Sequence, residues 1–136
     1  MLFRSASGNI GRRAVAALRD AGASVITTSR GRVDSGGREA IDFEADLLVT
    51  ADREKLIGDA KATHLLHLAW YSDHGSFWTA PENIAWLSAS ADLLKRFADH
   101  GGRRAVVAGT CAEYDWNDLP QGVIPETASK IGRAHV

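Results

Sequence analysis

Apolar and polar positions along this chain follow two alternating patterns. Short apolar runs predict strands over residues 1–4, 24–28, 40–43, 63–69 and 104–109. Between them, apolar positions that recur every three or four residues predict helices over residues 10–21, 51–60 and 81–100. Strands that alternate with helices are typical of βαβ units with a parallel sheet. We therefore expect an α/β fold.

The predicted helices carry end signals and an apolar side. Gly22 and Gly101 follow the first and third helices, where glycine commonly ends a helix, and Thr50 is expected to cap the second. The apolar positions that define the first helix are Ile10, Ala14, Val15, Leu18 and Ala21. Those that define the third helix are Ile84, Leu87, Ala91, Leu94 and Phe97.

The composition excludes several classes of function but indicates no chemistry. A chain of 136 residues has the length of a single domain, 1–136, and its hydrophobic share of 45% is ordinary for a soluble globular protein. A net charge of -1 gives no electrostatic reason to bind nucleic acid or an anionic membrane. No apolar run is long enough to span a bilayer, and no signal peptide is recognisable. The single cysteine, Cys111, is typical of a reducing compartment, so we expect a cytoplasmic protein.

A glycine-bearing turn, Ser5-Ala6-Ser7-Gly8-Asn9-Ile10-Gly11, lies between the first strand and the first helix. A dinucleotide fold needs glycine where a Cβ would obstruct the turn, where the backbone approaches the pyrophosphate, and where the helix packs on its strand. Gly8 and Gly11 fill two of these positions, and Ser5 occupies the first. The helix N-terminus would supply N–H groups and partial positive charge to the phosphates. The segment therefore predicts a phosphate-binding loop; the alternative is a plain turn between strand and helix.

Four segments, in the same order, resemble motifs of the extended short-chain dehydrogenase/reductase family, the NAD(P)-dependent epimerases and dehydratases of nucleotide sugars. The turn at 5–11 resembles the family's Gly-x-x-Gly-x-x-Gly loop. Asp46-Leu47 resembles the Asp-Leu or Asp-Val pair that meets the adenine. His67-Leu68-Ala69-Trp70 resembles His-Leu-Ala-Ala at the end of the fourth strand, and residues 109–114 resemble Ser-Ser-Ser-x-x-Tyr after the fifth. The match corresponds to the front part of a family member.

The resemblance implies a fold, a cofactor and a substrate class. The fold is a Rossmann-type, doubly wound parallel sheet of about five strands in the order 3-2-1-4-5, with helices on both faces. The cofactor is NADP or NAD, and the full enzyme acts on a nucleotide sugar by epimerisation, dehydration or reduction. The expected cofactor-binding residues are Ser5, Ser7, Gly8, Asn9, Ile10, Gly11, Arg30, Asp46, Leu47, Leu68, Ala69 and Trp70.

Arg30 bears on the choice between the two cofactors. It follows the second strand, and Ser29 stands where an NAD-preferring member places Asp. An acid there binds the ribose 2′-hydroxyl, whereas a nearby arginine pairs with a 2′-phosphate. Arg30 therefore favours NADP, and the alternative is that it is a solvated loop charge.

The family's catalytic pair is missing from the chain. Family members use a Tyr-x-x-x-Lys pair beside a Ser or Thr, and Thr110 occupies the Ser/Thr position as the candidate catalytic residue. The alternative is that Thr110 simply ends a strand. None of the lysines has a tyrosine four residues before it. Family members commonly carry a Glu about eleven residues before the tyrosine, and Glu126 would place that tyrosine at 137. We expect that the chain stops before its Tyr-Lys segment and lacks the substrate-binding part.

Other conspicuous side chains have simpler explanations. The five histidines show no metal-ligand grouping, and His64 and His67 are three apart in one strand, so they face opposite sides. Trp70 and Tyr71 either line the mouth of the site or cap the sheet. The remaining tryptophans are interpreted as packing residues: Trp78, Trp86 and Trp116.

The missing pair leaves two alternatives to the front part of an enzyme. One is a non-catalytic, cofactor-sensing binding module, and the other is an inactive fragment. Residues 105–108 form an apolar strand at the edge of the expected sheet, and one of its faces has no helix to cover it. We expect a homo-oligomer in which this strand, or residues 110–136, packs against a neighbour. The alternative is that the tail folds back through Leu119, Val123 and Ile131.

Overall fold

The computed structural model describes residues 1–4, 8–31, 41–73, 75–110, 113–114, 124–125 and 127–128. The strands are β1 (Leu2–Arg4), β2 (Ile26–Ser29), β3 (Phe43–Glu44), β4 (His64–His67) and β5 (Arg104–Val107). The helices are α1 (Asn9–Asp20), α2 (Thr50–Ala60) and α3 (Glu82–Asp99). The predicted elements thus all form, in the predicted order.

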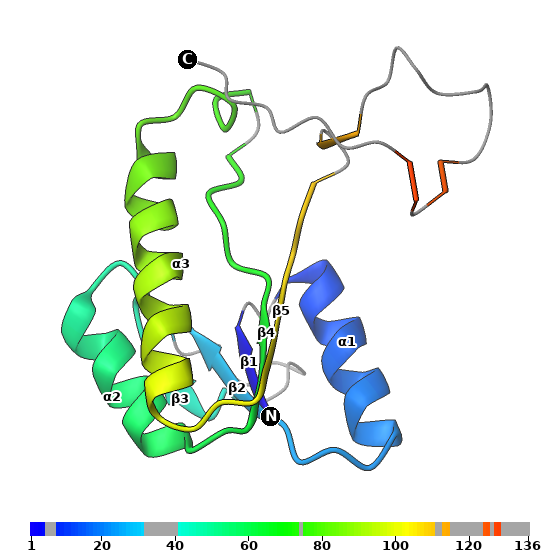
Figure 1. The fold of residues 1–136 in the computed structure, drawn as a ribbon, viewed down its shortest axis with the longest axis vertical. Helices are drawn as coiled ribbons and strands as arrows, with labels where there is room; N and C mark the ends of the chain where they lie inside the picture. Colours follow the sequence, from blue (N-terminus) through cyan, green and yellow to red (C-terminus); the bar gives the residue numbers. More distant parts are fainter. Residues whose placement is uncertain are drawn as a thin grey trace.

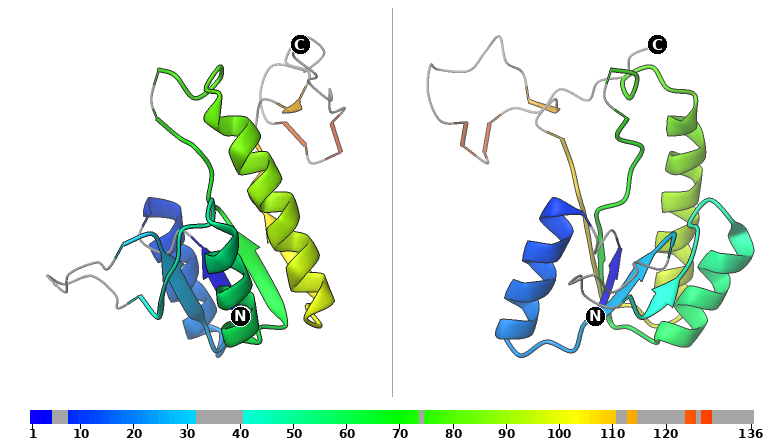
Figure 2. Two further views of the ribbon diagram at one scale, coloured as in Figure 1. Left: turned by 90° about the vertical axis from the view of Figure 1, so that its left-hand side faces the viewer. Right: turned by 180° about the vertical axis from the view of Figure 1, so that it is seen from behind.

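The five strands form one parallel sheet in the order β3-β2-β1-β4-β5. The predicted strand order is confirmed. Figures 1 and 2 show the sheet as the middle layer, with α1 on one face and α2 and α3 on the other. Because the strands are parallel, all their carboxyl ends lie on the same edge of the sheet, which we call the carboxyl edge.

The observed strands are shorter than the apolar runs that predicted them, and β3 overlaps its predicted range, 40–43, only at Phe43. Residues 2–4 of β1 pair with residues 26–28 on one side and 65–67 on the other. Residues 24 and 25 precede this ladder, so β2 begins at Ile26 rather than at Ser24 as predicted. The same limit ends β4 at His67 and leaves Leu68 and Ala69 just beyond the carboxyl edge.

The main core lies between the sheet and the pair of helices α2 and α3. Its most deeply buried members, each at 2% exposure or less, are Leu2, Leu47, Leu56, Leu65 and Leu93. The other face has a thinner cover. There Val15 of α1 is fully buried, and the partly buried Leu18, Val25 and Leu66 pack against it.

Arg53, a buried cation, joins α2 to α3. Its Nε donates to Asp92 at 2.7 Å, and Asp92 also accepts from Arg96 at 2.8 Å. Its remaining nitrogens donate to the Leu47 carbonyl and to Thr50 Oγ1. The prediction that Thr50 caps α2 is therefore wrong. The helix begins at Thr50 itself, and the Thr50 hydroxyl accepts a hydrogen bond from Arg53 instead of from the helix backbone.

The apolar sides of the helices agree only in part with the predicted ones: Val15 on α1 and Phe97 on α3 are buried as predicted. Ile10 on α1 is 74% exposed, and Ile84 and Leu87 on α3 are 70% and 59% exposed. The buried positions of α3 are Trp86, Ala89, Ser90, Leu93 and Phe97. The helix thus carries two apolar stripes, and only the one that faces α2 and the sheet is covered. Ile84, Leu87 and Ala91 form the other stripe, which is exposed among the described residues.

The tryptophans include both buried and exposed residues. Trp86 is a packing residue, as predicted, since it is buried in the main core. Trp78 is 65% exposed, so the packing interpretation is wrong for this residue; its ring lies against Phe77, with centroids 4.8 Å apart and the rings tilted by 37°. Trp116 lies outside the described residues. No helix of the described part is long and apolar enough to cross a membrane.

Candidate functional site

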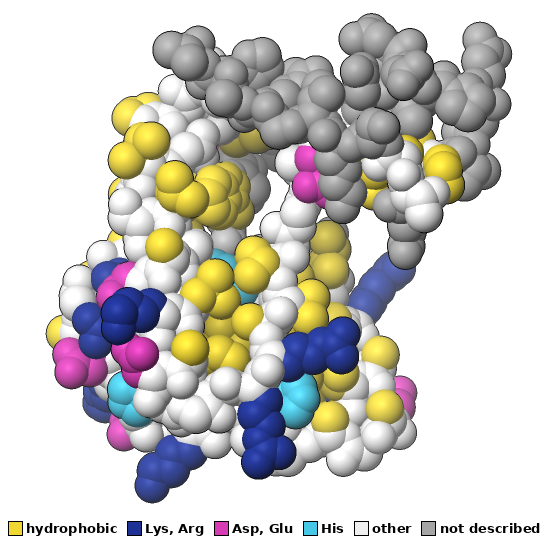
Figure 3. Space-filling view, in the orientation of Figure 1, with side chains coloured by type: hydrophobic (Ala, Val, Ile, Leu, Met, Phe, Trp, Pro, Cys, Tyr) yellow, Lys and Arg dark blue, Asp and Glu magenta, His cyan; other side chains and the backbone are white. Residues whose placement is uncertain are grey.

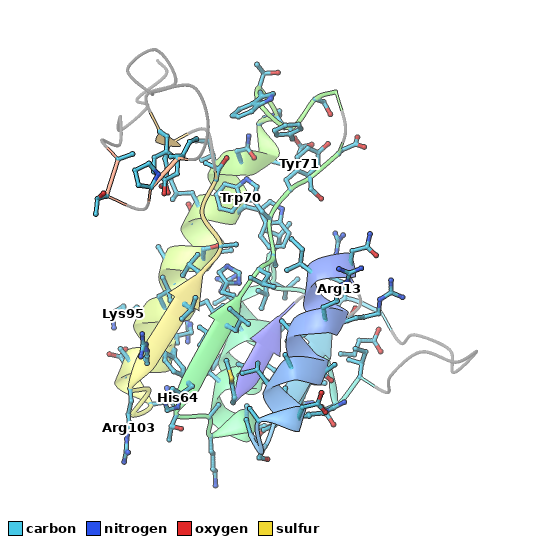
Figure 4. All side chains as sticks on the ribbon, turned by 90° about the vertical axis from the view of Figure 1, so that its right-hand side faces the viewer. Arg13, His64, Trp70, Tyr71, Lys95 and Arg103 are labelled. Atoms are coloured by element: carbon cyan, nitrogen blue, oxygen red, sulfur yellow. The ribbon has the colours of Figure 1, made fainter. Side chains whose placement is uncertain are left out.

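The carboxyl edge of the sheet collects most of the residues that the sequence singled out. Gly8 follows β1, Arg30 follows β2, Asp46 and Leu47 follow β3, and Thr110 follows β5. Leu68, Ala69 and Trp70 follow β4. Figure 4 shows Trp70, Tyr71 and Arg13 at this edge, and His64 and Arg103 at the opposite one. The strand order reverses between β1 and β4, and such a reversal leaves a crevice in which doubly wound folds bind ligands.

The N-terminus of α1 opens beside this crevice. Gly8 occupies the N-cap position with extended backbone angles, φ -77° and ψ 167°, and no side chain of the described residues caps the helix. The first turn holds no acidic residue, and the Asn9 side chain is turned to accept from Arg12 at 3.0 Å. The N–H groups of the first turn have no carbonyl within the helix to bind. The helix end is therefore suited to an anion such as a phosphate.

Gly11 has a different position from Gly8. Gly11 is buried, whereas Gly8, Asn9 and Ile10 are exposed. The last glycine of the turn thus lies on the buried side of α1, and dinucleotide folds use a glycine at such a position for close packing of helix and strand. Ser5 and Ser7 lie outside the described residues.

The turn after β3 is held from α2. The backbone N–H of Asp46 donates to Asp52 at 2.8 Å, while Asp46 Oδ1 accepts from the N–H of Leu48 at 3.0 Å. The Leu47 side chain is 1% exposed, and its carbonyl accepts from Arg53. These hydrogen bonds hold Asp46 and Leu47 in place at the carboxyl edge. The sequence reading missed Asp52 and Arg53, although an acid and an arginine in the first turn of α2 were visible signals.

A hollow of about 260 Å³ opens between α3 and the ends of β4 and β5. It is lined by His67, Leu68, Ala69, Trp70, Leu87, Ser90, Ala91, Leu94, Val107 and Ala108. His67 is 1% exposed and lies 2.9 Å from the Ser90 hydroxyl through Nε2, whereas His64 is exposed, as predicted from their spacing. Figure 3 shows the apolar surface of this region between α3 and β5.

The two aromatic residues after β4 have different surroundings. Trp70 is 47% exposed and lines the hollow. Tyr71 is half-buried and packs against the main core. Whether either residue borders a ligand stays a prediction.

The residues after β2 and β5 are exposed at the same edge. Arg30 is exposed, and so are Arg12 and Arg13 near the start of α1, which the sequence reading did not single out. Thr110 is exposed, and its carbonyl accepts from the N–H of Glu113 at 3.2 Å. In the described part of the chain, no cluster of histidine, cysteine, aspartate and glutamate could hold a metal ion.

Comparisons with known proteins agree with this architecture. The sequence profile of the NAD dependent epimerase/dehydratase family matches residues 6–131. No curated protein sequence matches the chain significantly.

Three solved structures share the fold. A UDP-glucose 4-epimerase from Thermotoga maritima, determined with UDP-glucose, has a TM-score of 0.74 at 21% identity, over 95% of this chain and 43% of its own. MoeE5 in complex with UDP-glucose and NAD has a TM-score of 0.71 at 24% identity, over 95% and 41%. An L-threonine 3-dehydrogenase from Trypanosoma brucei has a TM-score of 0.69 at 21% identity, over 83% and 37%. The chain thus spans less than half the length of these proteins.

Proposed function

Since the chain belongs to the NAD dependent epimerase/dehydratase family, we propose that it is the dinucleotide-binding part of an NAD(P)-dependent enzyme that epimerises, dehydrates or reduces a nucleotide sugar. The observation that carries this proposal is the N-terminus of α1, which no side chain of the described residues caps and which opens beside the reversal of strand order. A crevice with unpaired N–H groups suits a pyrophosphate. In this reading residues 1–136 form one Rossmann domain of a cytoplasmic enzyme, and its substrate-binding part lies elsewhere.

Each part of the cofactor has a proposed contact. Residues from Gly8 to Gly11 hold the pyrophosphate, with Ser5 and Ser7 in the same turn. Asp46 and Leu47 meet the adenine, since both follow β3 at the carboxyl edge. Leu68, Ala69 and Trp70 border the nicotinamide end. The first turn of α1 and the end of β4 lie on either side of the crevice, as a cofactor that crosses it requires.

Two further roles concern specificity and chemistry. Arg30 pairs with the 2′-phosphate of NADP, because it is exposed just after β2 and a guanidinium binds phosphate oxygens in a bidentate manner. Thr110 donates a hydrogen bond to the reacting oxygen of the substrate. The cofactor would exchange a hydride with a sugar carbon, and the residues of this chain would hold it in place for that exchange.

The substrate class has narrower support than the cofactor. Two of the three structures compared above were determined with UDP-glucose, and the third is named for L-threonine. The alternative is a non-catalytic, cofactor-sensing module. The coding sequence after codon 136 discriminates between these readings: a Tyr-x-x-x-Lys pair encoded there supports the enzyme.

The proposal can be tested by calorimetric titration of the chain with NADPH and NADH. The substitution Gly8→Asp places a good helix cap at this position, so the fold is retained. Its carboxylate occupies the N–H groups and repels phosphate. A charge-assisted hydrogen bond contributes about 1.5–3 kcal/mol, so we expect affinity to fall roughly 10- to 100-fold.

The matched control is Gly58→Asp. It adds the same charge to α2 at a position with no atom within 4 Å of the new Cβ. We expect this variant to bind as the unmodified chain does. If Gly8→Asp bound both dinucleotides with undiminished affinity, the N-terminus of α1 would not be the phosphate site.

A further inference from the structure

A single peptide group joins Arg53 of α2 to the carboxylate of Asp46. The carbonyl of Leu47 and the N–H of Leu48 belong to the same peptide group, which is planar. Arg53 donates a hydrogen bond to that carbonyl, and that N–H donates to Asp46 Oδ1 at 3.0 Å. Because the two ends of a planar group turn together, the guanidinium of Arg53 fixes the direction of the N–H that holds the Asp46 carboxylate.

The guanidinium of Arg53 is itself held firmly. The Arg53 side chain is 7% exposed, and its Nε donates to Asp92 of α3 at 2.7 Å. Another of its nitrogens donates to Thr50 Oγ1 at 2.9 Å, and Asp92 also accepts from Arg96 at 2.8 Å. The donors of a guanidinium form a rigid, planar fork. With partners on several of these donors, Arg53 cannot turn away from the Leu47 carbonyl without breaking hydrogen bonds in the interior.

Stability alone does not require an arginine at this position. Figure 2 shows α2 and α3 on the same face of the sheet, and both helices supply apolar residues to the main core, among them Leu56 and Leu93. Apolar residues of similar volume can often replace a buried ion pair with no loss of stability, or with a gain. An apolar residue at position 53 could not, however, donate a hydrogen bond to the Leu47 carbonyl.

We propose that Arg53 is a positioning residue for the adenine of the cofactor, a role that rests on the proposed contact of Asp46 with that base. The amino group of adenine is a hydrogen-bond donor, and a carboxylate accepts from it. Arg53 orients the Asp46 carboxylate through the peptide group between Leu47 and Leu48. The backbone of Asp46 is held from the same helix, because its N–H donates to Asp52 at 2.8 Å.

NADPH and its hypoxanthine analogue separate this role from a purely structural one. In hypoxanthine a carbonyl oxygen replaces the amino group of adenine, so the Asp46 carboxylate meets an acceptor instead of a donor. We expect the unmodified chain to bind NADPH roughly 10- to 100-fold more tightly than the analogue, as for one charge-assisted hydrogen bond. A general loss of stability weakens the binding of both ligands alike. Only a displaced Asp46 carboxylate changes the ratio of the two affinities.

Arg53→Met and Arg96→Met are a matched pair of variants for calorimetric titration with both ligands. Each removes a guanidinium that donates to Asp92, but the other side-chain partner of Arg96 among the described residues is Glu54 and not the turn after β3. The ratio should fall at least about fivefold in Arg53→Met and stay unchanged in Arg96→Met. Arg53→Lys is a second variant that keeps a cation for Asp92 but carries a single nitrogen, and it should lower the ratio too. Circular dichroism checks that the variants fold.

The possible outcomes distinguish this role from the proposed function. If the ratio stays unchanged in folded Arg53→Met or Arg53→Lys, Arg53 does not position the adenine, and the proposed cofactor contacts still stand. A ratio that falls equally in Arg96→Met would also overturn the role, because it would then depend on the contact between α2 and α3. If the unmodified chain binds NADPH and the analogue equally, Asp46 does not meet the adenine amine and Arg53 has no such role. An unmodified chain that binds neither ligand would overturn the proposed function itself.

Discussion

The two leucines Leu87 and Leu93 of α3 provide a direct test of which side of this helix holds the fold together. Leu93 is 1% exposed in the main core, whereas Leu87 is 59% exposed on the second stripe. Leucine to alanine removes three carbon atoms, at about 0.8 kcal/mol each when buried, and leaves a cavity that adds to the loss. We expect Leu93→Ala to reduce the free energy of unfolding by about 3–4 kcal/mol.

The same change at Leu87 should have a much smaller effect. Somewhat less than half of the Leu87 surface is buried, so Leu87→Ala should reduce the free energy of unfolding by less than about 1 kcal/mol. Both variants are best compared with the unmodified chain by urea unfolding at the same protein concentration. Equal losses for the two variants, or a larger loss at Leu87, would refute the assignment of the covered stripe.

Two further predictions concern the cofactor and the acid range. Arg30→Ala should remove most of the preference for NADPH over NADH. The difference between the two binding free energies should change by about 1.5–3 kcal/mol. If calorimetry finds equal affinities for both cofactors in the unmodified chain, Arg30 does not pair with the 2′-phosphate. The hydrogen bonds from Arg96 and then from Arg53 hold the pKa of Asp92 below its ordinary value. A lowered pKa adds stability above the ordinary value near 4, and the gain is lost as pH falls through the folded-state pKa. Asp92→Asn should therefore flatten the fall in unfolding midpoint below about pH 4, and an unchanged acid limb would contradict this.

The order of elements could be predicted from the sequence because alternating apolar runs and helical spacing are local signals. Which residues of a helix are buried was less predictable. Both stripes of α3 have helical spacing, and Leu87 and Leu93 belong to different ones. Which stripe is covered depends on where α2 and the sheet lie, and this is a property of the tertiary structure. The spacing alone selected Ile84, Leu87 and Ala91, which are exposed, together with Leu94 and Phe97, which pack in the main core.

Some residues of the candidate site could likewise be predicted from the sequence and others could not. The glycines and the residues after each strand could be placed because parallel strands bring their carboxyl ends to one edge. The roles of Asp52 and Arg53 could not be predicted, because their partners come next to them only in the folded chain. These partners are the backbone of Asp46 and Leu47 and the side chain of Asp92. Thr50 shows the same limit: its hydroxyl was expected to bind the helix backbone, but the nearby guanidinium is a stronger donor.

The short central strand has a consequence for the folding reaction. β1 pairs on one side with residues 26–28 but on the other with residues 65–67, so the sheet cannot close until a distant segment reaches the start of the chain. Pairings between residues far apart in sequence require loop closure before any stabilising contact is gained, and they slow folding. Until β4 arrives, the segment from β1 to β2 is a single strand pair with one helix, which is marginally stable in water. We expect the two sides of β1 to form as one cooperative unit, with the approach of β4 as the rate-limiting event.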